Sequence, residues 1–429
     1  MKHAHRFCWS SAASGLAILL ITVGSLPKAY CASPSGVTYD LQVGLDAWDL
    51  RPSVQQDTAE NQVGNTRLFL ANSTPYWTYE NTSPWVKFQG SVRILDNTLL
   101  SMRYRRDVSS GSRLDELSVD QAINSFGMRA GVLDYKTSWC RTYDVDSPWV
   151  RENDPFCTVR TTSQSIRAAP GVQLYANNSL GDLRLQAVAG IYNPLQFDYT
   201  STEFTNSALN AYSKVIKNDK VGLSFNVTDV ETALELRLSF LHTDQAANVR
   251  TSLTEPTYRI EQTVDVVYAG ISFNPVPPLT VRITHLGSNM QGKSYYPDGW
   301  VRPDDTAAEV LYRDNAPKES NVVELNFQAN AQDVYSLAYS VYDLSTDSIG
   351  YTYDPVSRVT TAASNTEAFD FRNTNTSISW RRDWKKGVFT VLQWTSAQAQ
   401  SASKPGANAP LATANSNGTA IGLRLGYRF

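Results

Sequence analysis

The stretch of sequence that decides the fold is TAIGLRLGYRF, which spans residues 419–429. Its residues alternate in character, with Thr419, Ile421, Leu423, Leu425, Tyr427 and Phe429 in one set and Ala420, Gly422, Arg424, Gly426 and Arg428 in the other. Alternate side chains of a β-strand point to opposite faces of the sheet, so one face here is apolar with an aromatic end and the other is small or cationic. Such a strand suits a wall between lipid and water. An edge strand of a soluble sandwich shares the pattern, so the stretch alone leaves both folds open.

The same alternation recurs along the chain. One clear run places Leu234, Leu236, Leu238 and Phe240 opposite Glu235, Arg237 and Ser239. Similar runs lie near residues 37–46, 86–94, 100–105, 183–189, 279–283 and 323–328. Many such strands without a helical segment between them are hard to place in a water-soluble protein, so the alternation favours a membrane β-barrel.

Short turns and long polar connections separate these runs. Seven short turns rich in Asn, Asp, Gly or Pro are expected at Asp96–Thr98, Asn124–Gly127, Asn178–Gly181, Thr228–Glu231, Asn274–Pro278, Asn330–Asp333 and Asp383–Gly387. Eight longer connections are expected near 51–82, 107–114, 137–164, 195–217, 244–257, 290–318, 346–366 and 399–415. We therefore predict an all-β fold, a transmembrane antiparallel β-barrel of about sixteen strands with short periplasmic turns and long external loops.

The amino-terminal segment has the pattern of an export signal. Lys2 and Arg6 precede an uncharged apolar run, residues 12–26, which is too short to span a membrane as a helix. We predict a signal peptide over residues 1–31, with an approximate cleavage site, and a single barrel domain over residues 32–429. Lys28 and Tyr30 do not fit a lipoprotein box before Cys31, which argues against a lipid anchor.

Two cysteines, Cys140 and Cys157, lie in one connection of the predicted mature chain. In an oxidising compartment such a pair should form a disulfide, and closing a loop of this size stabilises the fold by about 3 kcal/mol in the chain-entropy model. Two thiols without nearby histidines cannot complete a tetrahedral metal site, so we expect no metal here.

The terminal Phe429, the strand count and the position of loop 137–164 together carry a family resemblance. The chain resembles the sixteen-stranded general porins of bacterial outer membranes, and its last strand resembles the closing strand that their assembly machinery reads. The resemblance implies an outer-membrane channel for passive diffusion of small hydrophilic solutes and ions, narrowed by an inward-folded third loop. It also implies a homotrimer surrounded by outer-membrane lipid. A disulfide within the third loop is not general in that family.

Charged residues suggest a selectivity region for such a pore. Loop 137–164 carries four carboxylates between its cysteines, Asp144, Asp146, Glu152 and Asp154. The predicted lumen face supplies cations at Lys87, Arg93, Arg103, Arg105, Arg129, Arg184, Arg237, Arg282, Arg381, Arg424 and Arg428. A basic wall opposite an acidic loop would create a transverse field that sorts ions. The alternative is that these charges form local ion pairs with little effect on transport.

Other functions have less support in the sequence. A hydrolase would need a nucleophile beside a base, and His242 and His285 lie near strand ends without such a setting, so we expect no enzyme activity. The external loops could instead serve a receptor or adhesin, and loop 51–82 is apolar enough for a partner surface. The net charge of −3 gives no basic stripe for nucleic acid. Phosphate loops and dinucleotide fingerprints are lacking, so no cofactor is expected.

Overall fold

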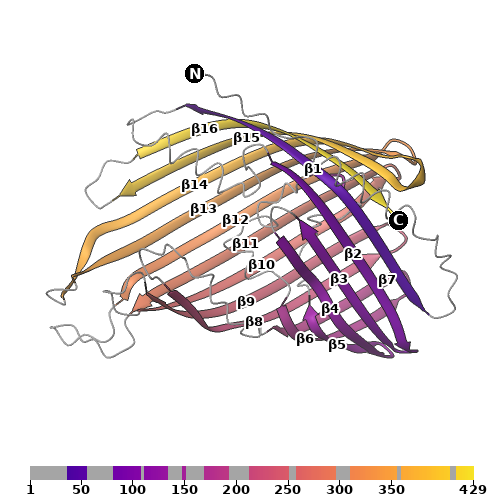
Figure 1. Ribbon diagram of the computed structural model, residues 1–429, viewed down its shortest axis with the longest axis horizontal. Helices are drawn as coiled ribbons and strands as arrows, with labels where there is room; N and C mark the ends of the chain where they lie inside the picture. The colour runs from indigo at the N-terminus through magenta and orange to yellow at the C-terminus, as the bar shows by residue number, and fades with distance from the viewer. Residues whose placement is uncertain are drawn as a thin grey trace, which may run out of the picture.

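The computed structural model describes residues 36–55, 81–107, 111–133, 147–150, 169–192, 212–250, 258–295, 310–354, 359–405 and 412–429. These residues form one closed antiparallel barrel of sixteen strands (Figure 1), which confirms the predicted fold class. Each strand pairs with its neighbours in the sequence, and β1 pairs with β16 to close the sheet. No helix in the described ranges is long and apolar enough to cross a membrane.

The strands differ in length around the barrel. The first eight are β1 (Val37–Gln55), β2 (Asn81–Leu95), β3 (Thr98–Asp107), β4 (Gly111–Ile123), β5 (Phe126–Leu133), β6 (Ala169–Leu180), β7 (Leu183–Tyr192) and β8 (Tyr212–Asp229). The others are β9 (Leu234–Arg250), β10 (Tyr258–Val276), β11 (Leu279–Tyr295), β12 (Val310–Gln328), β13 (Asp333–Asp354), β14 (Val359–Asp383), β15 (Val388–Pro405) and β16 (Ala412–Arg428). A short 3-10 turn, Lys385–Gly387, separates β14 from β15.

The stretch at residues 419–429 closes the barrel. Within β16, Tyr427 pairs with Val43 of β1, and the backbone N–H of Phe429 donates to the carbonyl of Leu41 at 3.0 Å. The rings of Tyr427 and Phe429 meet edge to face at 4.4 Å between centroids. The first and last described strands therefore lie side by side, as the indigo and yellow ribbons show in Figure 1.

Each of the seven predicted short turns connects two strands, but several longer connections were predicted wrongly. Residues 346–366 were expected to be a loop, whereas β13 continues to Asp354 and β14 begins at Val359, with Tyr351 paired to Ala362. Likewise, β9 continues to Arg250. Backbone pairing does not require an apolar face, so strands continue where the alternation has ended.

The two faces of the wall differ in polarity as the alternation predicts. On β9, Leu236, Leu238 and Phe240 are 40–52 % exposed, whereas Ser239 between them is 3 % exposed. The other strands likewise expose many Val, Leu, Ile, Phe, Tyr and Trp side chains, and the buried residues include many polar ones. Side chains on the concave inner face are shielded by the surrounding wall, so the apolar face is the outer one. An apolar outside and a polar inside is the arrangement of a transmembrane barrel.

Candidate functional site

The candidate site is the inner wall of the barrel, where most of the predicted basic residues lie beside carboxylates of the same wall. The ion pairs are Arg103–Glu116 at 3.5 Å, Arg129–Asp120 at 2.7 Å, Arg237–Glu235 at 2.6 Å, Arg282–Glu324 at 3.4 Å, Arg381–Asp383 at 2.7 Å, Arg424–Asp46 at 2.8 Å and Arg428–Asp40 at 3.2 Å. Their partners were not anticipated from the sequence. The positive field of the wall is therefore largely balanced locally.

The remaining predicted residues are placed as follows. Lys87 is buried in the wall, and Arg93 and Arg184 are exposed. Arg105 lies on β3 opposite Lys87, and its side chain is outside the description. The acidic set Asp144, Asp146, Glu152 and Asp154 lies outside the described residues, as do Cys140 and Cys157. The structure therefore groups basic residues with wall carboxylates and leaves the acidic loop and its disulfide as predictions.

Arg424 on β16 is the most buried charged group of the described wall, at 1 % exposure. Its Nε and Nη2 donate to the two carboxylate oxygens of Asp46 at 2.8 and 2.9 Å. The indole Nε1 of Trp85 donates to the same carboxylate at 3.0 Å. The guanidinium also lies over the Trp85 ring at 5.7 Å. A Cβ at position 44 would lie only 2.3 Å from that ring, so Gly44 is what lets Trp85 lie flat against β1.

The same guanidinium binds a segment that belongs to the connection between β5 and β6. Arg424 Nη1 donates to the carbonyl of Trp149 at 3.1 Å, and Nη2 donates to the carbonyl of Val150 at 2.8 Å. Arg381 on β14 adds a third bond, from Nη1 to the carbonyl of Ser147 at 3.3 Å. We call residues 147–150 the docked segment. It contacts the inner face of β14–β16.

Apolar packing accompanies these hydrogen bonds. Val150 belongs to one buried cluster with Trp85, Phe389, Val391, Ala397 and Ala420. Trp149 is also buried, at 2 % exposure, and its backbone N–H donates to the hydroxyl of Ser147 at 3.2 Å. The docked segment is thus held by charge-assisted hydrogen bonds to its carbonyls and by burial of its two apolar side chains.

The strands that the docked segment contacts are not neighbours of β5 and β6, the two strands that its connection joins. In the closed order of sixteen strands, β6 and β14 are eight steps apart in either direction, which places them on opposite sides of the barrel. Between the end of β5 at Leu133 and the start of β6 at Ala169, residues 147–150 contact Arg381 of β14, which is opposite β6, and Arg424 of β16, which is five steps from β5. A connection between adjacent strands therefore reaches the opposite wall.

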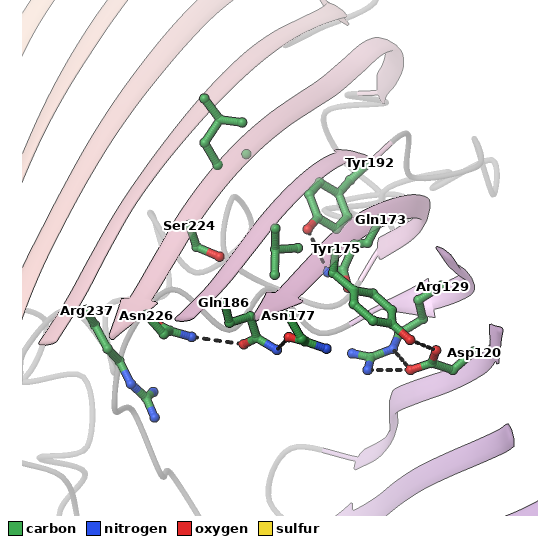
Figure 2. A pocket seen from close by; sticks show the side chains of 13 residues that line it. Asp120, Arg129, Gln173, Tyr175, Asn177, Gln186, Tyr192, Ser224, Asn226 and Arg237 are labelled. Carbon is green, nitrogen blue, oxygen red and sulfur yellow. Dashed lines mark hydrogen bonds and ion pairs between the residues drawn. The ribbon is translucent and has the colours of Figure 1, made fainter. Parts of the chain in front are cut away.

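A polar cavity of about 300 Å³ lies on the inner face of β4–β9 (Figure 2). At one side of it, Asp120 accepts from the Arg129 guanidinium at 2.7 Å and from the Tyr175 hydroxyl at 2.5 Å. Deeper in the wall, Gln173 donates to the Tyr192 hydroxyl at 2.7 Å. Of the residues that line this cavity, only Arg129 and Arg237 were predicted from the sequence as part of the site. Its amides and tyrosines could have been found only by aligning the strands in register.

The two histidines do not lie near strand ends, where they were predicted from the sequence to lie. His242 and His285 lie within β9 and β11, each between two buried inward residues, so both face outward. His242 Nδ1 lies 2.7 Å from Asp265, and His285 Nδ1 lies 2.8 Å from Asn321. Their other cross-strand neighbours are Val221 and Ala269, which supply no nucleophile. In the described part of the chain, no group of three or more His, Cys, Asp or Glu residues could hold a metal ion.

Comparisons with known proteins support the fold. The chain is similar to OmpT (in-vitro folded), an outer membrane protein of Vibrio cholerae, with TM-score 0.51 and 9 % identity over 94 % of this chain and 100 % of that chain. Outer-membrane expressed OmpT of Vibrio cholerae gives TM-score 0.50 and 10 % identity over 92 % and 97 %. An anion-selective porin from Comamonas acidovorans gives TM-score 0.47 and 12 % identity over 92 % and 100 %. No family model matches the chain, and no curated protein does. The similarity to OmpT establishes a shared fold, that of an outer-membrane β-barrel.

Proposed function

We propose that the protein is a channel of the bacterial outer membrane for passive diffusion of small hydrophilic solutes and ions. The observation that carries the proposal is a closed sixteen-strand barrel with a polar, ion-paired inner wall and an apolar outer face. Barrels of this strand number are wide enough to leave an aqueous bore. Charged residues inside such a bore remain hydrated, whereas on the outer face they would meet acyl chains.

We further propose that the connection between β5 and β6 narrows this bore. The three hydrogen bonds from Arg381 and Arg424 to the docked segment support this proposal, because they hold part of that connection against β14 and β16, away from the strands that it joins. A segment that crosses the lumen reduces its cross-section and limits the size of solutes that pass. The carboxylates Asp144, Asp146, Glu152 and Asp154 would lie near this constriction, where they would influence ion preference.

Reconstitution tests the proposed channel directly. Purified protein in a planar bilayer should produce discrete, uniform conductance steps in potassium chloride. Heat-denatured protein in the same detergent is the control and should produce none. A folded preparation, verified by its strand-rich circular dichroism spectrum, that gives no steps would refute the channel proposal.

The Arg129–Asp120 pair allows a test of local charge balance. Asp120→Asn removes the carboxylate and leaves the Arg129 charge facing the cavity, so the chloride-to-potassium permeability ratio should rise, by roughly twofold to fivefold. Reversal potentials in a salt gradient measure the ratio. Arg129→Gln is the reciprocal control and should shift the ratio in the opposite direction. If the permeability ratio shifts by the same amount and in the same direction in both variants, the charges of the pair do not influence permeating ions.

The predicted disulfide, signal peptide and external loops involve residues that the structure does not describe. The Cys140–Cys157 disulfide and the signal peptide over residues 1–31 remain predictions, as does a role of the external loops in a receptor or adhesin. A homotrimer is implied by the family resemblance and is also a proposal for this chain.

A further inference from the structure

Three amides on adjacent strands form a hydrogen-bonded row on the inner wall. Asn177 of β6 is directly opposite Gln186 of β7, and Gln186 is directly opposite Asn226 of β8. Asn226 Nδ2 donates to Gln186 Oε1 at 3.1 Å, and Gln186 Nε2 donates to Asn177 Oδ1 at 2.9 Å. We call these three residues the amide row. Arg237 of β9 stands opposite Asn226 and extends the row (Figure 2).

The amide row is already ordered but still has hydrogen-bonding capacity. Its two bonds use one donor of Asn226 and one acceptor of Asn177, so the row itself leaves the Asn177 amide as a donor and the Asn226 carbonyl as an acceptor. Asn177 and Gln186 are exposed on the cavity side of the wall. Because the side chains are fixed by one another, a solute that binds them loses little free energy in ordering the site.

The two arginines that line the cavity are each paired with a carboxylate, whereas the exposed Arg184 lies two residues before Gln186 on β7 and outside the lining. Arg129 is paired with Asp120 at 2.7 Å, and Arg237 is paired with Glu235 at 2.6 Å, so two cations face two carboxylates. An ion entering the cavity would lose hydration without meeting a net opposite charge. A neutral solute with many hydroxyl groups avoids this cost, and each hydroxyl can both donate to and accept from an amide.

We propose that the amide row is a binding subsite for neutral polyhydroxylated solutes of sugar size, placed on the wall of the channel near the short turns. The cavity of about 300 Å³ lies at the lower end of the range for small-molecule sites, roughly 300 to 1,000 Å³. This inference rests on the proposed channel function, since the solute must enter the bore. It adds a preferred class of solute.

Current block by a sugar tests the subsite. Sucrose should reduce the open-channel current of the wild-type protein in a saturable manner, whereas a polyethylene glycol of similar hydrated size should reduce it without saturation. Gln186→Leu removes both bonds of the row and should weaken sucrose binding by roughly fivefold to tenfold. Gln89→Leu, at an exposed position on the inner face of β2 away from the cavity, should leave sucrose binding unchanged.

The outcomes separate this inference from the channel proposal. Wild-type protein without conductance steps would refute both. Conducting protein whose block by sucrose does not saturate, or whose binding is equal in Gln186→Leu and wild type, would refute the subsite alone. Stronger saturable block by gluconate than by sucrose would refute the neutral class of solute. Should Gln186→Leu fail to insert, Asn226→Ala removes one bond of the row and should weaken sucrose binding in the same direction.

Discussion

Replacing Arg424 by methionine should destabilise the barrel by about 3–5 kcal/mol, the cost of leaving one partner of a buried ion pair without the other. The guanidinium is 1 % exposed and holds both oxygens of Asp46, and methionine of similar length would keep the packing against Trp85 while removing all four hydrogen bonds. Two of those bonds hold the docked segment. We therefore also expect the open-channel current to fluctuate between levels as the segment exchanges between docked and undocked positions.

Thermal and denaturant unfolding in detergent micelles measures the first effect, and single-channel recording measures the second. Arg428→Met is the matched control, since Arg428 lies four residues further along the same strand and pairs with Asp40 at 49 % exposure. Exposed pairs contribute about 0–1 kcal/mol, so this variant should unfold close to the wild type. Equal losses of stability in the two variants would contradict the role assigned to Arg424. A steady current in Arg424→Met would show that its bonds do not hold the segment.

The faces of the wall and the short turns were predictable because both depend on local sequence. The alternation of Leu425 with Arg424 decides which side chain lies on the outer face of the barrel. Asn and Gly residues mark tight turns such as the one at Gly181, whose φ is +61°. How far the strands extend beyond the region of apolar alternation was not predictable from local sequence. There, pairing such as Tyr351 with Ala362 joins polar segments that carry no periodic signal.

The partners of the wall arginines depend on register and closure rather than on local sequence. Arg424 and Asp46 are separated by 378 positions and meet only because β16 pairs with β1. The amide row likewise requires three strands to align at one level. A sequence pattern can therefore indicate a charged inner face, but the amount of that charge left unbalanced becomes visible only in the folded barrel.

An arginine introduced on the outer face should lower the free energy of unfolding strongly, whereas an arginine introduced on the inner face should lower it little. Leu238 is 52 % exposed on β9, beside outward Phe225 of β8 and Ala269 of β10. Leu238→Arg should lower the free energy of unfolding in lipid vesicles by about 2–4 kcal/mol, because the charge would lie in the hydrocarbon region.

Leu238→Ala measures the loss of apolar contact alone and separates it from the cost of the charge. Gln186→Arg is the matched inward variant, at an exposed position of the polar cavity, and should cost far less. Equal costs for the two arginine variants would mean that the apolar face does not meet lipid, and the channel proposal would then fail together with the assignment of the two faces.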